Sequence, residues 1–316
     1  MEKKNIIGII VVVVIVLVAV VSLVYYGLLY SKKYLTIYHA GSLTVPFEKY
    51  KELFEKQYGV EVRLYAAGSR QLAMEIVDLG KRPDIYASAD YALIEQLLIP
   101  NYTKWYMIFA SNEMVIAYTN NSRYSDIINA TNWFEILNRS DVFWGHSDPD
   151  LDPCGYRTLL VLKLAEIYYN NTEIYDDLKS NSNRVIRPKS VDLLSLLESG
   201  ELDYAFEYKS VAVQHNLSYV ELPKEINLGY WEYKDYYKQA NVTLSDGTEI
   251  VGAPIAYGIT ILINASNFDY AVDFIRFLIE NRDILENLGQ NPIYPIVVNN
   301  ISVLPPELRD FAREET

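Results

Sequence analysis

The sequence predicts an α/β protein with two lobes around a central cleft, preceded by an N-terminal hydrophobic helix. First, 316 residues exceed the usual size of one hydrophobic core. Second, short apolar stretches alternate with amphipathic stretches after Lys33, which is typical of strand and helix units. Third, two strongly strand-like stretches flank a central block of about 135 residues, as expected if the chain crosses twice between lobes.

The N-terminal segment is long and uncharged. Ile6 to Tyr30 gives about 25 uncharged residues, which at about 1.5 Å per residue exceeds the roughly 30 Å core of a bilayer. We expect residues 1–33 to be a membrane anchor, because the short basic start favours retention inside the cell. The rest of the chain would then lie on the extracytoplasmic face. A cleavable signal peptide is the alternative, disfavoured by the long apolar run.

In the first part of the chain after Lys33, the sequence pattern predicts three strands in succession, each followed by a turn that leads toward a helix. The expected strands and helices are Tyr34 to His39 (strand), Val45 to Tyr58 (helix), Val60 to Ala66 (strand), Gln71 to Leu79 (helix) and Asp84 to Ala87 (strand). Their alternation favours largely parallel sheets.

The two crossings are predicted at Glu113 to Thr119 and at Ile255 to Ile263. Lobe one would comprise residues 34–115 and 257–316, and lobe two residues 116–256. In lobe two we expect a helix over Thr158 to Tyr169 and a strand over Asp203 to Tyr208.

Charge and composition exclude several classes of protein. A net charge of −13 and the absence of a Lys/Arg cluster oppose nucleic-acid binding. His39, His146 and His215 show no metal-binding spacing, and no nucleophile elbow or phosphate-binding loop is present. The sequence therefore predicts a protein that is not an enzyme and needs no cofactor. The single cysteine, Cys154, is interpreted as a structural thiol.

Two Gly-Ser turns are candidates for binding an anion. Gly41-Ser42 and Gly68-Ser69 each follow a predicted strand and precede a predicted helix. A helix start offers free N–H groups and a partial positive charge, so an oxyanion is stabilised there without Lys or Arg. Simple N-capping by serine is the alternative for each turn taken alone.

Two acidic residues are candidates in the second lobe. Asp152 and Pro153 precede an apolar run and predict a helix start whose carboxylate faces the cleft, with a plain helix cap as the alternative. Glu207 interrupts an aromatic, strand-like stretch, so it is either a surface residue or buried for a purpose.

Five segments carry a resemblance to a known family: HAGSL (39–43), AAGSRQLA (66–73), DIYASADY (84–91), DPDLDPCGYR (148–157) and FEYKSVAVQHNL (206–217). In this order they resemble the archaeal molybdate/tungstate-binding proteins, the WtpA family, which are type II periplasmic binding proteins of ABC importers. The resemblance covers almost everything after the anchor.

The resemblance implies an oxyanion held in the cleft between the lobes. It implies that Ser42 and Ser69 donate from lobe one, that the turn from Asp152 through Pro153 to Cys154 contributes from lobe two, and that Asp152 and Glu207 bind the metal itself. We include Gly41 with its turn, and Tyr257 as a further candidate for which packing is the alternative. The implied partners are tungstate or molybdate, a membrane permease and its ATPase, with the binding protein a monomer.

Carboxylates beside a dianion would repel it by several kcal/mol at low effective dielectric, with about 4 kcal/mol per pair of charges at 4 Å. The hypothesis that removes this conflict is that each carboxylate binds the hexavalent metal and raises its coordination number. Sulfate and phosphate cannot expand their coordination in this way, so the same carboxylates would exclude them.

Two alternatives stay open at the level of the sequence. One is a ferric-iron or other-anion binding protein of the same fold, which 28 tyrosines allow. The other is a carbohydrate-active enzyme that uses Asp152 and Glu207 as its carboxylate pair.

Overall fold

The computed structural model describes residues 13–22 and 34–314. The chain divides into two compact units, Met1–Tyr34 and Leu35–Thr316. Residues 13–22 are helical. Most of the predicted membrane anchor lies outside the described residues, and among the helices that are described none is long and apolar enough to cross a membrane.

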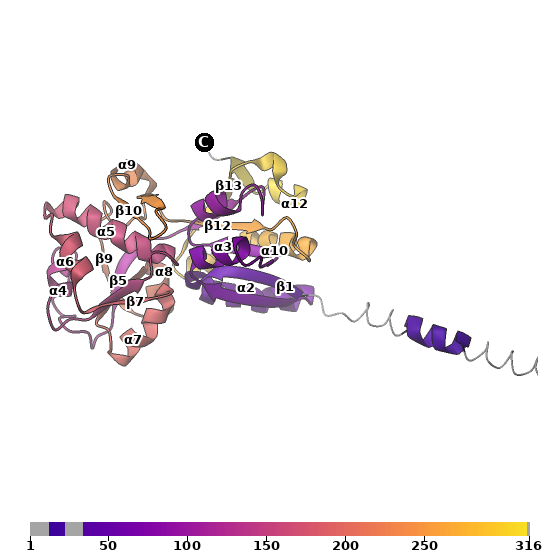
Figure 1. Ribbon diagram of the computed structural model, residues 1–316, viewed down its shortest axis with the longest axis horizontal. Helices are drawn as coiled ribbons and strands as arrows, with labels where there is room; N and C mark the ends of the chain where they lie inside the picture. Colours follow the sequence, from indigo (N-terminus) through magenta and orange to yellow (C-terminus); the bar gives the residue numbers. More distant parts are fainter. Residues whose placement is uncertain (1–12, 23–33, 315–316) are drawn as a thin grey trace, which may run out of the picture. The chain divides into compact units, whose positions relative to one another are not determined.

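The unit Leu35–Thr316 is built on two main sheets, which we call the first lobe (seven strands) and the second lobe (five strands). In Figure 1 the second lobe carries the magenta middle of the chain, whereas the first combines purple N-terminal and yellow C-terminal segments. The strands are β1 (Tyr34–Ala40), β2 (Glu61–Ala67), β3 (Ile85–Ser88), β4 (Met107–Ser111), β5 (Met114–Tyr118), β6 (Trp144–Ser147), β7 (Arg184–Arg187), β8 (Tyr204–Tyr208), β9 (Ser218–Glu221), β10 (Asn241–Thr243), β11 (Glu249–Val251), β12 (Ala256–Ile261), β13 (Asn291–Val298) and β14 (Ala312–Glu314).

Helices surround both sheets. The α-helices are α2 (Thr44–Tyr58), α3 (Ser69–Val77), α4 (Trp133–Leu137), α5 (Pro153–Tyr169), α6 (Ile174–Ser180), α7 (Leu194–Ser199), α8 (Lys209–Gln214), α9 (Lys234–Tyr237), α10 (Phe268–Glu280), α11 (Asp283–Asn287) and α12 (Pro306–Arg309). Shorter helical turns are η1 (Gly41–Leu43), η2 (Ile94–Leu98), η3 (Ser190–Leu193), η4 (Trp231–Tyr233) and η5 (Ile301–Val303).

The strand order is β14-β13-β4-β12-β3-β1-β2 in the first lobe and β7-β6-β8-β5-β9 in the second. β1 and β3 are parallel, as are β6 and both of its neighbours. However, β12 is antiparallel to β3 and β4, and β5 is antiparallel to β8 and β9. The expectation of largely parallel sheets is therefore wrong.

The physical reason lies in the crossings. β1 and β3 end at the edge of the first sheet that faces the second lobe, and Gly258 near the start of β12 pairs with Ser88 at the end of β3. A strand that enters a lobe from a crossing begins at this edge, whereas a strand followed by a βα turn ends there. Two such strands side by side are therefore antiparallel. The second lobe has the same arrangement: Met114 at the start of β5, which enters from the crossing, pairs with Tyr208 at the end of β8.

The chain changes sheets between Ser111 and Met114, and β12 begins at Ala256 after the short β10-β11 hairpin. The described strands thus lie close to both predicted crossings. We keep residues 34–115 with 257–316, and residues 116–256, as our proposal for the two lobes.

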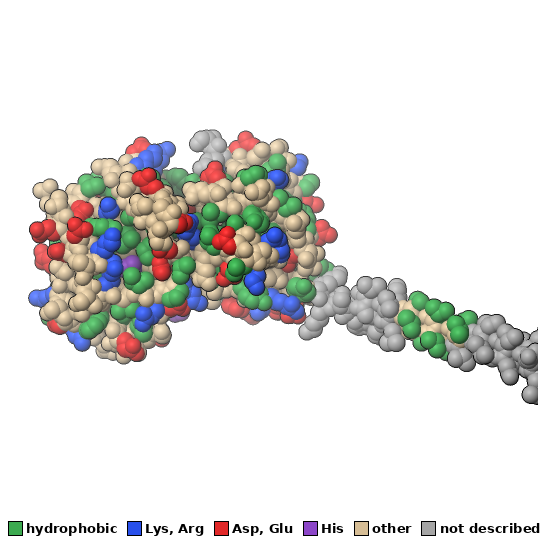
Figure 2. Space-filling model, viewed as in Figure 1, with side chains coloured by type: hydrophobic (Ala, Val, Ile, Leu, Met, Phe, Trp, Pro, Cys, Tyr) green, Lys and Arg blue, Asp and Glu red, His purple; other side chains and the backbone are tan. Residues whose placement is uncertain are grey.

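Aromatic side chains fill much of both cores. On α2, Phe47, Tyr50 and Phe54 are fully buried along one face, because residues three and four apart share a side of a helix. They meet Phe274 of α10 in edge contacts. In the second lobe Trp144 packs edge-on against Phe206 of the neighbouring strand β8. These contacts hold each sheet against its helices. On the surface, Figure 2 shows basic and acidic side chains interspersed over the visible face.

Candidate functional site

The candidate residues gather where the strands end at the facing edges of the two lobes. Ser42 follows β1, Ser69 follows β2, Asp152 follows β6 and Glu207 is the last residue but one of β8. All four side chains are buried. Parallel strands bring the residues at their carboxyl ends to one edge, which is the usual place for a ligand in an open α/β sheet.

The Gly41-Ser42 turn forms η1 and contacts the second lobe. A Cβ on Gly41 would lie 3.2 Å from Val191 Cγ2. Ser42 does not cap α2, whose N-cap is Leu43 without a side-chain hydrogen bond. Instead, Ser42 Oγ accepts a hydrogen bond of 3.1 Å from the Tyr257 hydroxyl. The capping alternative is therefore wrong for Ser42, whose hydroxyl belongs to a network at the cleft.

The Gly68-Ser69 turn contacts the second lobe even more closely. A Cβ on Gly68 would lie 2.4 Å from the carbonyl oxygen of Leu151, so only glycine allows this approach. Gln71 donates its N–H to the same carbonyl at 3.0 Å. The two lobes are therefore in direct contact at this turn.

Ser69 occupies the first position of α3, behind Gly68 as N-cap, and makes no capping hydrogen bond. Its Oγ accepts from the N–H of Ala89 at 3.0 Å, and its carbonyl accepts from the Tyr86 hydroxyl at 2.7 Å. Since the Ala89 N–H can only donate, the Ser69 hydroxyl keeps its own hydrogen for another acceptor. The capping alternative is wrong here too.

Asp152 is the N-cap of α5, with Pro153 in the first turn. One carboxylate oxygen accepts from the N–H of Cys154 at 3.2 Å and the other from the N–H of Ser190 at 2.9 Å. Pro153 has no N–H and so cannot donate to a ligand; its fixed φ favours the helix start. Asp152 therefore caps the helix and also ties η3 to α5 within the second lobe.

Glu207 is fully buried, so it is not a surface residue. Its Oε2 accepts from the N–H of Tyr208 at 3.3 Å, while its Oε1 has no hydrogen-bond partner among the described residues. The Ser147 hydroxyl is buried near the Asp152 carboxylate, whose pKa it helps to lower, but it makes no hydrogen bond of ordinary geometry within the described part of the chain. Buried polar atoms left unpaired are costly, so this corner of the site has capacity for a polar ligand.

Electrostatics couple the two acids. Burial and then the neighbouring Asp152 carboxylate raise the pKa of Glu207 to about 8. Burial also raises the pKa of Asp152, against the hydrogen bonds from Ser190 and Cys154 that lower it. Both shifts reflect a dry environment, and the effect of Asp152 on Glu207 indicates that the two acids are near each other. Burial raises the pKa of the Cys154 thiol well above its usual value, which agrees with a structural thiol.

Tyr257 lies on β12 and is fully buried, 5.9 Å from the Tyr208 ring between centroids. Burial raises the pKa of both hydroxyls. Among the residues that the structure describes, no group of three His, Cys, Asp or Glu side chains could hold a free metal ion.

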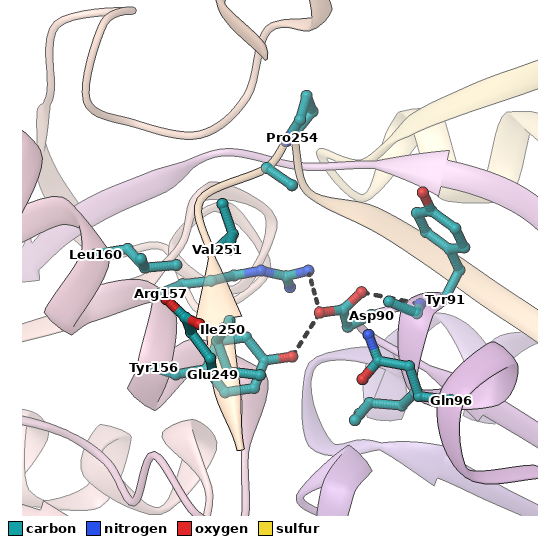
Figure 3. A pocket seen from close by; sticks show the side chains of 13 residues that line it. Asp90, Tyr91, Gln96, Tyr156, Arg157, Leu160, Glu249, Ile250, Val251 and Pro254 are labelled. Atoms are coloured by element: carbon teal, nitrogen blue, oxygen red, sulfur yellow. Dashed lines mark hydrogen bonds and ion pairs between the residues drawn. The ribbon is translucent and has the colours of Figure 1, made fainter. Parts of the chain in front are cut away.

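A pocket of about 260 Å³ lies beside this cluster rather than on it, and none of the predicted site residues lines it. Figure 3 shows Tyr156 and Arg157 of the second lobe pointing at Asp90 of the first. The Tyr156 hydroxyl donates to Asp90 at 2.5 Å, and Arg157 lies 3.4 Å from the same carboxylate oxygen. Arg157 also donates to the carbonyl of Ala89 at 2.8 Å. We call these contacts the Asp90 latch.

The structure thus brings the predicted residues to one cleft but adds others that the sequence analysis missed. Ser190 binds Asp152, Asn112 binds Tyr257, and Asp90 joins the lobes. Asp90 and Arg157 fall inside segments that carried the family resemblance, so that signal was present. Ser190 and Asn112 had no motif to mark them.

Two α/β lobes that touch across a cleft containing hydroxyl donors and two buried acids define a binding protein for a small solute. The chain belongs to the bacterial extracellular solute-binding proteins, because the model of that family matches residues 35–289. This membership indicates an extracytoplasmic location.

Curated relatives agree. The chain is 50% identical over 288 residues to an uncharacterized solute-binding protein of Petrotoga mobilis, covering 88% of this chain and 90% of the relative. It is 46% identical over 277 residues to the molybdate/tungstate-binding protein WtpA of Pyrococcus abyssi, covering 78% of this chain and 80% of that protein. The resemblance drawn from the sequence motifs is confirmed.

Solved structures share the fold. The periplasmic molybdate-binding protein of Azotobacter vinelandii aligns with a TM-score of 0.61 at 18% identity, over 81% of this chain and 98% of that one. The sulfate-binding protein SubI of Mycobacterium tuberculosis aligns with a TM-score of 0.61 at 12% identity, over 88% of this chain and 90% of that one. The predicted fold class is therefore confirmed.

Proposed function

We propose that this protein captures tungstate or molybdate outside the cytoplasm and delivers it to an ABC importer. The observation that carries the proposal is the pair of buried acids, Asp152 and Glu207, beside the serine turns at the cleft. A site for sulfate would be served by donors alone. Two carboxylates favour an anion whose central atom accepts further oxygen ligands.

In this proposal Ser42 and Ser69 donate to the oxygens of the anion, and Gly41 allows its turn to approach. Asp152 and Glu207 bind the metal, and Cys154 lines the site behind them. Pro153 favours the start of α5. Tyr257 contributes to anion binding either through its hydrogen bond to Ser42 or by a contact of its own next to Ser42. The likeness to WtpA supports this assignment, since the relative is named for both oxyanions.

The proposal is tested by titration calorimetry with tungstate on the double variant Asp152→Ala, Glu207→Ala. Hydrogen bonds or contacts of charged groups contribute about 1.5–3 kcal/mol each, so affinity should fall about 100-fold or more. The control is Asp148→Asn, which removes a charge from the same acidic segment outside the cluster and should leave affinity unchanged. Unchanged affinity of the double variant would refute metal binding by these acids.

Selectivity is tested by native mass spectrometry with tungstate, molybdate, sulfate and phosphate in competition. Tungstate and molybdate should occupy the protein while sulfate and phosphate do not. Preferential loading of sulfate would contradict the proposal. A coloured ferric complex would favour the iron alternative, and hydrolysis of a glycoside by the purified protein would favour the enzyme alternative.

We further propose that the protein acts as a monomer whose N-terminal segment anchors it in the membrane. A permease would recognise the two lobes after closure, and its ATPase would drive transport. The direct contacts between lobes at Gly68 and Asp90 support closure by a hinge. Small-angle scattering should show a smaller radius of gyration with tungstate; identical curves would contradict hinge closure.

A further inference from the structure

Asn112 occupies the first crossing, between β4 and β5, and is 1% exposed. Its Oδ1 accepts from the N–H groups of Glu113 at 3.0 Å and Ser210 at 3.3 Å. Its Nδ2 donates to Ser210 Oγ at 2.7 Å and to the Tyr257 hydroxyl at 3.2 Å. Backbone N–H groups only donate, so they fix which end of the amide carries the oxygen.

This orientation sets the direction of the hydrogen bonds that follow. The Asn112 amide nitrogen can only donate, so the Tyr257 hydroxyl accepts from it and gives its own hydrogen to Ser42 Oγ, 3.1 Å away. Ser42 in turn accepts from Tyr257, and its own hydrogen must point elsewhere. A chain of donors therefore runs from the crossing through Tyr257 to the serine at the cleft.

We infer that Asn112 is a positioning residue that acts through Tyr257 to keep Ser42 a hydrogen-bond donor toward the ligand. The inference rests on the proposed function and extends it to a residue outside the predicted site. A serine held as a donor favours ligand oxygens that only accept, which are those of a fully deprotonated oxyanion.

The same side chain joins the two lobes. Ser210 lies at the start of α8, three residues after Glu207, whereas Tyr257 and Ser42 belong to the first lobe. Asn112 therefore contacts the lobe that supplies the acids and, through Tyr257, the serine of the other lobe. Hydrogen bonds in such a buried chain polarise one another, so their effects should not be additive.

The test is a double-mutant cycle of Asn112→Asp and Tyr257→Phe, read by titration calorimetry with tungstate. The new carboxylate has almost the same shape as the amide but accepts where the amide donates, so it takes the hydrogen of Tyr257 away from Ser42. Each single variant should bind tungstate about tenfold more weakly. In the Tyr257→Phe background, Asn112→Asp should change affinity by no more than about twofold.

Additive losses would overturn the inference, because a carboxylate that merely repels the anion acts equally with or without the tyrosine hydroxyl. The matched control is Asn227→Asp, which makes the same change at a buried asparagine near the crossing. Asn227 donates to Glu113 Oε2 at 2.8 Å and to the Leu222 carbonyl at 3.4 Å, and accepts from the N–H of Gly229 at 2.9 Å, so these hydrogen bonds do not involve Tyr257. It should lower the unfolding temperature and leave affinity unchanged; an equal loss of affinity would also overturn the inference.

Circular dichroism checks that each variant folds. If Asn112→Asp does not fold, Asn112→Ala takes its place in the cycle with the same expected non-additivity, since it also leaves Tyr257 without its donor. Failure of the unsubstituted protein to bind tungstate and molybdate would refute the proposed function and this inference together. Tight binding by that protein with additive losses would refute the inference alone.

Discussion

Glu207 is the residue whose chemistry decides how the anion is held. Burial beside Asp152 raises the pKa of Glu207 to about 8, so in the free protein this acid carries a proton at neutral pH. A protonated acid can donate to an oxygen of the anion, whereas metal coordination needs the carboxylate. These two modes respond to pH in opposite directions.

We expect tungstate binding near pH 7 to release about one proton, and affinity to rise as the pH approaches about 8. Calorimetry in buffers of different ionisation enthalpy measures the proton release, and Glu207→Gln should abolish it. Binding without proton release, with affinity falling above pH 8, would instead assign Glu207 as a donor to the anion's oxygens.

The same shift affects the stability of the free protein. A folded-state pKa raised above the unfolded value means that the folded protein holds the proton more tightly. The contribution of Glu207 to the free energy of unfolding is therefore fully present below about pH 4.5 and is lost as the pH rises through about 8. Glu207→Gln should flatten this part of the stability profile, which denaturant titration across the range measures.

Gly68 offers a separate test of contact between the lobes. Its φ of −60° suits any residue, but a Cβ would lie 2.4 Å from the Leu151 carbonyl of the other lobe. Gly68→Ala should therefore leave the unfolding temperature of the free protein nearly unchanged and weaken tungstate binding at least about tenfold. Equal affinity would show that the lobes do not need this approach.

At the scale of elements, α5 begins at the residue that the site also uses. Asp152 caps α5 and also faces Glu207, so replacing it with alanine removes two functions at once. Asn caps a helix about as well as Asp, whereas Ala costs about 1 kcal/mol of stability. The choice of substitution can therefore separate the cap from the ligand.

We expect Asp152→Asn to keep the cap of α5 through its amide oxygen but to lose the hydrogen bond from the N–H of Ser190, because an amide has only one accepting oxygen. Its free energy of unfolding should therefore fall less than that of Asp152→Ala, which loses both hydrogen bonds, while both variants should lose tungstate affinity. Denaturant titration and calorimetry on the same samples measure the two quantities. Full affinity in Asp152→Asn would show that the residue serves α5 alone.

The elements themselves could largely be predicted from sequence. The apolar face of Phe47, Tyr50 and Phe54 is a local pattern, so α2 was predicted to within one residue of its start. Strand direction was not predicted well, because whether β12 runs with or against β3 depends on where the chain enters the lobe. The four hydrogen bonds of Asn112 involve three residues, and two of these, Ser210 and Tyr257, lie 98 and 145 positions away along the chain, so no local pattern records them.

At the scale of the whole molecule, the Asp90 latch connects the start of α5 to the opposite lobe. Arg157 is buried, and it contacts Ala89 and Asp90 on the other side of the cleft as well as the Tyr208 hydroxyl of its own lobe, to which it donates at 2.7 Å. In the closed arrangement the buried guanidinium needs its carboxylate partner, and losing that partner destabilises it. In the open arrangement water hydrates the guanidinium, so the partner matters less there. The latch therefore favours the closed arrangement.

Asp90→Asn should weaken tungstate binding about tenfold or more, mainly through faster release, and leave the unbound protein almost as stable. Stopped-flow measurement of tungstate release tests this. Arg123, which pairs with Asp203 within the second lobe, provides the control: Arg123→Gln should leave the release rate unchanged. Equal release rates for the Asp90 variant would remove the latch from the closing motion.

The sequence holds one cysteine, and it lies fully buried at the start of α5, beside both acids and close to Tyr257 of the first lobe. Because no other thiol competes, the rate at which a thiol reagent labels Cys154 reports those openings of the protein that expose this buried thiol. Cys154 can therefore serve as a natural probe of opening, and no further cysteine has to be introduced. Saturating tungstate should slow that labelling, and Gly68→Ala should raise the tungstate concentration needed for this effect at least about tenfold.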